Sequence, residues 1–194
     1  MRPYPLTSEA LIDDVVDGLD AVTSTVRSAL GHLPADHLSW QPSPERWSAG
    51  QCLLHLARTG EAYRDVLAPV LDRARTGGVA SPAPLRGTLL GRAFTGWMAP
   101  GRGMKGRTPA VFRPDPERSP ADAVDVFLEE QGRLRALALT AKGLDLDGMR
   151  VRSPASSLLR LTVGDALRAL VEHEWRHIRQ AEAVLGDPAF PGRP

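Results

Sequence analysis

Apolar residues recur every three or four positions in four long segments of the chain, which is the pattern of amphipathic helices. The first segment predicts a helix over residues 8–31, with Thr7 as its N-cap. The second predicts a helix over residues 48–76, which starts at a capping box formed by Ser48 and Gln51. Each of these two helices therefore has its own start signal.

The third and fourth segments follow the same pattern. The third covers residues 119–143 and opens with an N-cap serine, a proline and an acidic residue. A loop is expected at 143–161, and Thr162 then caps a helix over residues 162–186. No stretch alternates apolar and polar residues for long enough to indicate a strand. We therefore predict an all-α fold, a four-helix bundle that forms a single domain over residues 1–194.

A long crossover at about residues 78–119 joins the second and third helices and is rich in glycine and proline. Residues 85–98 are expected to form a short helix within it. From residue 73 to residue 114 there are eight Lys or Arg residues and no acid. This basic segment could meet an anionic substrate, but a solvated loop is the interpretation that we favour. Since the segment contains no aromatic-interleaved basic motif, direct nucleic-acid binding is not expected.

Composition narrows the classes of protein further. The apolar fraction is 42% and the net charge is +1, so no strongly charged partner is indicated. The single cysteine excludes an internal disulfide framework and suits a reducing compartment. No run approaches 18 apolar residues, and the first residues do not form the apolar core of a secretion signal. We expect a cytoplasmic protein that does not enter the membrane.

Two histidines in the fourth helix are the strongest chemical signal. His173 and His177 stand four residues apart and share one helical face, where a bundle helix normally buries leucine. Buried imidazoles need partners, and this spacing occurs in metal-binding helices. The alternative is a pair of core histidines that hydrogen-bond to the backbone, Glu174 or Gln180.

A third histidine can reach the same level of the bundle. His55 lies about 10 Å from the start of the second helix, and His177 lies about 13 Å from the end of the fourth, at 1.5 Å per residue. If these helices pack antiparallel, the three imidazoles meet. Three histidines with an open fourth position are typical of catalytic metal sites. His32 and His37 flank a loop and are expected at the surface.

Two motifs carry a resemblance to a known family. The segment W-Q-P-S-P-E-R-W-S-A-G-Q-C-L-L-H-L, which ends at Leu56, resembles the lead-in to the second helix of the DinB-like superfamily. The segment H-E-W-R-H-I-R-Q, which starts at His173, resembles the family's fourth-helix motif. The resemblance implies a four-helix bundle with a long crossover between helices two and three. It also implies three metal-binding histidines, which correspond to His55, His173 and His177.

Other residues near the histidines are further candidates. Gln180 could hydrogen-bond a ligand histidine, and Arg58, one turn beyond His55, could hold an anionic group of a substrate. Arg176 is a second candidate for that role. Cys52 could reach the metal, but a small buried thiol is the interpretation that we favour. Glu174 could orient a neighbouring group or lie sideways on the helix.

The resemblance implies two classes of function. Characterised enzymes of the family are mostly metal-dependent transferases and isomerases that use low-molecular-weight thiols, alongside hydrolases, and zinc or nickel is the expected metal here. The alternative is a non-catalytic bundle, associated with stress or DNA damage, that acts by dimerising or binding a partner. We also expect a homodimer, from the resemblance and from apolar residues beside the seam of the fourth helix, which are Leu167, Val171 and Ile178.

Overall fold

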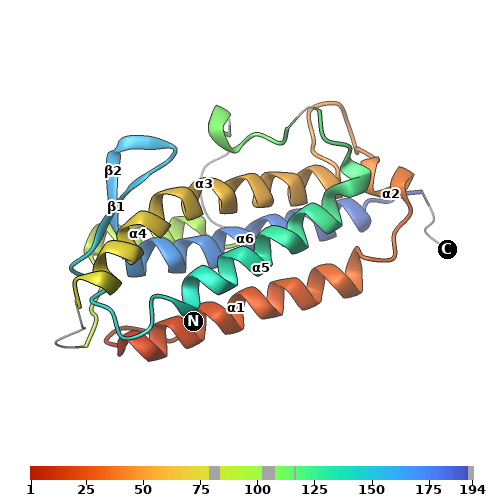
Figure 1. Ribbon diagram of the computed structural model, residues 1–194. Coiled ribbons are helices and arrows are strands. Elements are labelled where there is room, and N and C mark those ends of the chain that lie inside the picture. The colour runs from red at the N-terminus through yellow and green to blue at the C-terminus, as the bar shows by residue number, and fades with distance from the viewer. Residues whose placement is uncertain (79–83, 102–107, 116, 192–194) are drawn as a thin grey trace.

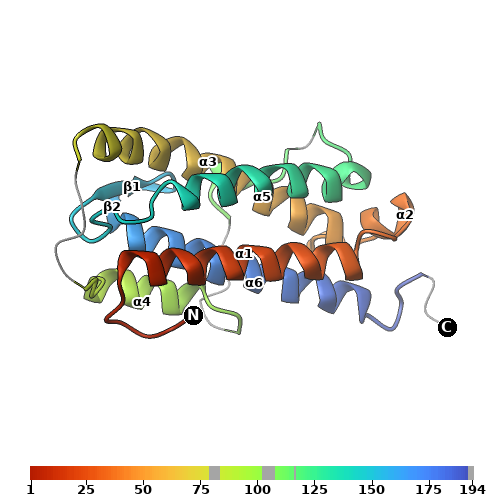
Figure 2. The ribbon, with the colours of Figure 1, turned by 60° about the horizontal axis from the view of Figure 1, so that its bottom comes forward.

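A computed structural model describes residues 1–78, 84–101, 108–115 and 117–191 of the chain. Four long helices form a bundle: α1 (Ser8–Ala29), α3 (Ala49–Thr76), α5 (Ala123–Leu139) and α6 (Val163–Leu185). Figures 1 and 2 show the four helices lying side by side. The predicted all-α four-helix bundle is confirmed, with one small sheet added to it.

The predicted N-caps hold the starts of the helices. The side-chain oxygen of Thr7 accepts the N–H of Ala10, and that of Thr162 accepts the N–H of Asp165. At the start of α3, Ser48 and Gln51 make both hydrogen bonds of the capping box. These bonds satisfy N–H groups that the first turn of a helix leaves without partners. Helix α5 starts after a 3-10 turn, η2 (Pro120–Asp122), and ends four residues earlier than the predicted limit of 143.

The segment predicted as a loop at 143–161 contains a β-hairpin instead. Strand β1 (Arg150–Ser153) pairs antiparallel with β2 (Ser156–Thr162), with Val151 opposite Leu161. Both of these residues are buried, and their neighbours in β1 alternate between exposed and buried positions. The alternation lasts only four residues in β1, which is too short to stand out from the sequence.

The crossover packs helix α4 (Leu89–Met98) against α6, where a short helix over 85–98 was predicted (Figure 2). Asp165, in the first turn of α6, accepts hydrogen bonds from the backbone N–H and the hydroxyl of Thr88, the N-cap of α4. Gly91 approaches Asp165 so closely that an added Cβ would lie 2.0 Å from the carboxylate. A 3-10 turn, η1 (Ala110–Phe112), then brings the chain back to α3. Part of the basic segment, including Arg102, Lys105 and Arg107, lies outside the described residues.

The core has two clusters of buried side chains, one toward each end of the bundle. The first joins α1, α3, α5 and α6 to η1 and the hairpin, and the second includes Cys52 and Ile178. Leu167, Val171 and Ile178 are each at most 2% exposed in this single chain. They pack inside the bundle and do not offer a surface to a partner, so that ground for a homodimer is wrong. Among the described helices, none combines the length and apolarity needed to cross a bilayer.

Candidate metal centre

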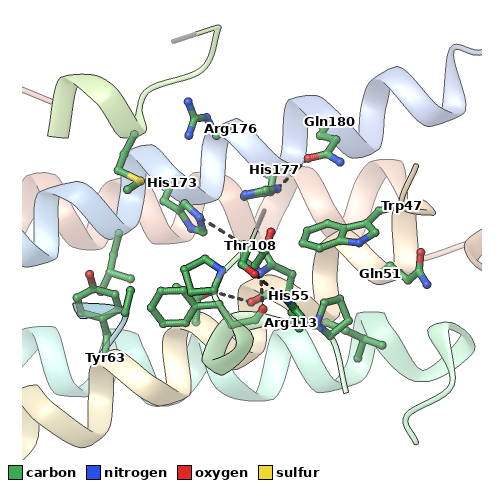
Figure 3. A pocket seen from close by; sticks show the side chains of 18 of the residues that line it. Trp47, Gln51, His55, Tyr63, Thr108, Arg113, His173, Arg176, His177 and Gln180 are labelled. Carbon is green, nitrogen blue, oxygen red and sulfur yellow. Dashed lines mark hydrogen bonds between the residues drawn. The ribbon is translucent and has the colours of Figure 1, made fainter. Parts of the chain in front are cut away.

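Three histidine rings meet between α3 and α6 (Figure 3). His55 comes from α3, and His173 and His177 come from α6, one turn apart. The ring centroids are 5.1 Å apart for His55 and His173, 4.4 Å for His55 and His177, and 4.6 Å for His173 and His177. One ligand atom from each ring lies within 4.8 Å of the other two, so the group could hold a metal ion.

Hydrogen bonds on the far nitrogens fix the tautomers of two rings. The Nδ1–H of His55 donates to the carbonyl oxygen of Phe112 at 2.6 Å, because a carbonyl can only accept. The Nδ1–H of His177 likewise donates to the amide oxygen of Gln180 at 2.9 Å. In both rings Nε2 therefore carries the lone pair, which is how metal-ligating histidines are usually held, and Nε2 of His55 lies within hydrogen-bonding distance of Nε2 of His173.

The spacing of the near nitrogens suits a small ion. The Nε2 atoms of His55 and His173 lie 3.3 Å apart. Two nitrogens that each stand 2.0–2.1 Å from a tetrahedral zinc ion are separated by about 3.3–3.4 Å. Nδ1 of His173 is buried and has no hydrogen-bond partner among the described residues. The spacing of the donor nitrogens is therefore compatible with a bound divalent metal ion.

Burial keeps these rings neutral. Loss of hydration lowers the pKa of His55 to about 4. For His177, burial and then the neighbouring His55 lower the pKa to about 3. The pKa of His173 falls well below its usual range for the same reasons. A neutral imidazole is the form that binds a metal, so the site favours the ligand state at neutral pH.

The histidines line a cavity of about 1720 Å³. The indole of Trp47 lies against two of the rings, with centroids 4.9 Å from His55 and 5.9 Å from His177. Helix α4 contributes Phe94, Trp97 and Met98 to the wall of this cavity. The histidines therefore face a space large enough for substrates and are not sealed in the core.

Of the other candidate residues from the sequence, Gln180 and Arg176 lie at the histidine cavity and Arg58 does not. Gln180 contacts His177, whereas Arg58 is half-exposed, forms an ion pair with Glu61 at 2.6 Å and lines a separate cavity of about 160 Å³. Arg176 lines the histidine cavity and donates to the carbonyl oxygen of Trp97 at 3.0 Å.

Cys52 and Glu174 lie outside the lining of the cavity. Cys52 is fully buried among apolar side chains, which raise the pKa of its thiol to about 12. Glu174 is buried and accepts a hydrogen bond from the side-chain N–H of Gln131 at 2.8 Å, and burial raises its pKa to about 8. Among the described residues, neither side chain forms a hydrogen bond with the histidine rings.

Some contributors could not be found from the sequence. The carbonyl of Phe112 is a backbone group and has no side-chain signature. Tyr63 and Ser153, which also line the cavity, come from α3 and β1 and share a hydrogen bond. Only the four-residue spacing from His55 to Thr59 to Tyr63 on α3 hinted that Tyr63 faces the same way.

Three neutral imidazoles converging beside a cavity define a four-helix-bundle protein with a three-histidine group suited to a divalent metal. A family model described as the DinB superfamily matches residues 19–181, a range that includes all three histidines. The chain belongs to the DinB superfamily, as its two motifs indicated. A search of curated proteins and a search of solved structures found no significant match.

Proposed function

We propose that this protein is a metal-dependent enzyme in which His55, His173 and His177 hold zinc or nickel. The observation that carries the proposal is the direction of the lone pairs. Phe112 and Gln180 accept the Nδ1 protons of two rings, so that the Nε2 atoms point to a common centre. Membership of the DinB superfamily, whose members bind metals, supports the same conclusion.

The reaction that we propose is transfer to or from the sulfur of a low-molecular-weight thiol, with hydrolysis as the nearest variant. A bound divalent metal lowers the pKa of a coordinated thiol or water toward neutrality. The protein's own residues orient the rings and keep them unprotonated. They also enclose a cavity that extends to both sides of the histidines, from Trp47 to Tyr63 (Figure 3). Room on two sides supports a reaction between two substrates.

Elemental analysis of the purified protein tests the metal. We expect one divalent ion per chain in the wild type, and less than one tenth of that in the His173→Ala/His177→Ala variant. The matched control is His32→Ala, because His32 is an exposed histidine away from the cavity. Cobalt(II) loading should give the intense visible absorption of a four-coordinate ion. Wild-type protein with no stoichiometric metal and no cobalt spectrum would contradict the proposal.

Activity is tested with cysteine and 1-chloro-2,4-dinitrobenzene. In this reaction the sulfur of cysteine bonds to the ring carbon, chloride leaves, and the thiol proton passes to the solvent. The metal-loaded wild type should accelerate appearance of the S-aryl product, and His55→Ala should abolish this acceleration. Equal rates in the two proteins would exclude a metal-dependent transferase for this pair of substrates.

An exposed apolar face on α4 favours a second candidate. Leu89, Leu90 and Trp97 are 79%, 56% and 43% exposed, respectively. A bundle associated with stress or DNA damage could bind a partner or a second copy through this face. Metal-free protein that sediments as a dimer, and becomes monomeric on Leu90→Lys substitution, would support this candidate.

A further inference from the structure

The cavity has two arms that lie on opposite sides of the histidines. Helix α3 contributes Gln51, His55, Thr59 and Tyr63 to its wall, at four-residue intervals. At 1.5 Å per residue, Gln51 and Tyr63 are about 18 Å apart along the helix. Figure 3 shows Trp47 and Gln51 on one side of His55 and Tyr63 on the other.

The arm that contains Tyr63 is lined by one core cluster. The lining side chains that belong to or pack against this cluster come from four helical elements and the hairpin: Tyr63, Phe94, Phe112, Leu159 and Leu170. The rings of Tyr63 and Phe112 stack, with centroids 6.0 Å apart and planes inclined by 16°. These five side chains are aliphatic or aromatic, so this part of the wall suits an apolar ligand body.

A pair of hydroxyl groups is the polar feature of this arm. The hydroxyl oxygen of Tyr63 lies 3.1 Å from Oγ of Ser153, and both residues are 5% exposed. Oγ of Ser153 also accepts the backbone N–H of Ala155 at 3.3 Å. Both hydroxyl residues line the cavity.

A count of hydrogens shows that this pair is incomplete. Two hydroxyl groups have two hydrogens, and the single bond between them uses one, whichever group is the donor. The other hydrogen has no acceptor among the described residues. A buried donor without an acceptor is costly, and a ligand oxygen in the arm would supply the missing acceptor.

We infer that this arm binds a small compound that has an apolar body and a carbonyl oxygen, which accepts the free hydrogen of the Tyr63–Ser153 pair. The inference deepens the proposed function. It rests on that function only for the role of the compound, which would be the electrophile that reacts with the thiol. Its binding to the arm requires no metal.

Equilibrium binding to metal-free protein tests the inference. The probes are 4-phenyl-2-butanone and butylbenzene, which share an aromatic body and differ in the carbonyl, with calorimetry as the readout. The quantity compared is the ratio of the two dissociation constants. We expect the preference for the ketone to fall by about three- to tenfold in the Tyr63→Phe/Ser153→Ala variant, the fold-change of one net hydrogen bond.

Single variants and a control make the test specific. Tyr63→Phe and Ser153→Ala each keep one hydroxyl with a free hydrogen, so each should lose less of the preference than the double variant. The control is Thr59→Val, because Thr59 lines the cavity but its hydroxyl already donates to the carbonyl of His55 at 2.9 Å. Thr59→Val should keep the wild-type ratio.

An unchanged ratio in the double variant would overturn the inference, as would an equal loss in Thr59→Val or a wild-type protein that binds neither probe. If the double variant does not fold, the single variants decide the question. At least one of them must lower the preference for the ketone, and an unchanged ratio of dissociation constants in both would overturn the inference. Metal content is measured separately on the same proteins. The binding ratio can therefore be interpreted even if the protein holds no metal, and the metal content can be interpreted even if neither probe binds.

Discussion

The amide oxygen of Gln180 accepts the Nδ1 proton of His177 at 2.9 Å, one turn further along the same helix. This bond fixes both the ring orientation and the tautomer of His177. We predict that Gln180→Leu weakens zinc affinity by about 10- to 100-fold, the usual effect of losing such a supporting bond. Gln180→Glu keeps an acceptor at the same place and should retain most of the affinity. Competition with a chromophoric chelator measures both, and equal affinities in all three proteins would contradict the role of Gln180.

Burial of the ligand rings predicts an unusual pH range for metal binding. Ordinary histidines, with a pKa near 6.5, would lose a metal as the pH falls below neutrality. Burial lowers the pKa of His55 to about 4 and that of His177 to about 3, so protons compete with the metal only in more acidic solution. The zinc-induced rise in Tm should therefore be similar at pH 7.5 and pH 5.5, and should begin to fall only near pH 4. A rise that is already lost between pH 7.5 and pH 6 would show that the rings titrate normally.

Burial of Glu174 predicts that folding stability falls as the pH rises, whereas metal binding falls as the pH decreases. Burial raises its pKa from 4.5 to about 8, so the folded state holds a proton that the unfolded state loses between these values. Stability from this group is present below about pH 4.5 and is lost as the pH rises toward 8. Glu174→Gln removes the titration and can still hydrogen-bond to Gln131. Relative to wild type, the variant should gain more than about 1.4 kcal/mol between pH 4.5 and pH 8.5, the equivalent of one pKa unit.

Chemical denaturation at the two pH values checks this difference. Gln131→Glu offers a contrast, because it would place two carboxyl groups together and should steepen the loss of stability with pH. A Glu174→Gln difference that does not change with pH would mean that Glu174 is ionised in the folded protein.

The approach of α4 to Asp165 predicts contrasting effects of two glycine substitutions. A Cβ at Gly91 would lie 2.0 Å from the Asp165 carboxylate, whereas a Cβ at Gly96 would meet nothing within 4 Å. Gly91→Ala should destabilise the protein by about 1–3 kcal/mol, the usual range for overpacking. Gly96→Ala should stabilise it by up to about 1 kcal/mol, because alanine is the better helix former. Thermal melts of both variants check the pair, and equal shifts would contradict this docking of α4.

The sequence predicted helix starts well because their signals are local. Thr7, Ser48 and Thr162 each bind a backbone N–H only three residues ahead, so four residues carry the whole interaction. The hairpin at 150–162 was missed because β1 is only four residues long and its stability comes from partners across the sheet.

The three histidines of the site could be predicted from the sequence more readily than the residues around them. The four-residue spacing of His173 and His177 is visible in the sequence, and antiparallel packing brings His55 to them. Arg58 was expected in the cavity because it lies one turn beyond His55. The side of α3 that lines the cavity instead passes through Thr59, and Arg58 faces Glu61. Which flank of a helix meets a cavity depends on packing that one helix alone does not encode.

His55 and His173 contact each other across 118 positions of the chain. A metal shared by α3 and α6 would act as a removable cross-link that closes this loop in a protein whose single cysteine rules out an internal disulfide. Because the three ligands converge only in the folded bundle, the metal would stabilise that state by mass action, by about 2.7 kcal/mol when the free metal concentration is 100 times its dissociation constant. The fraction of folded protein would then depend on the concentration of free metal. Loss of the metal would lower the stability of the whole bundle as well as remove its activity.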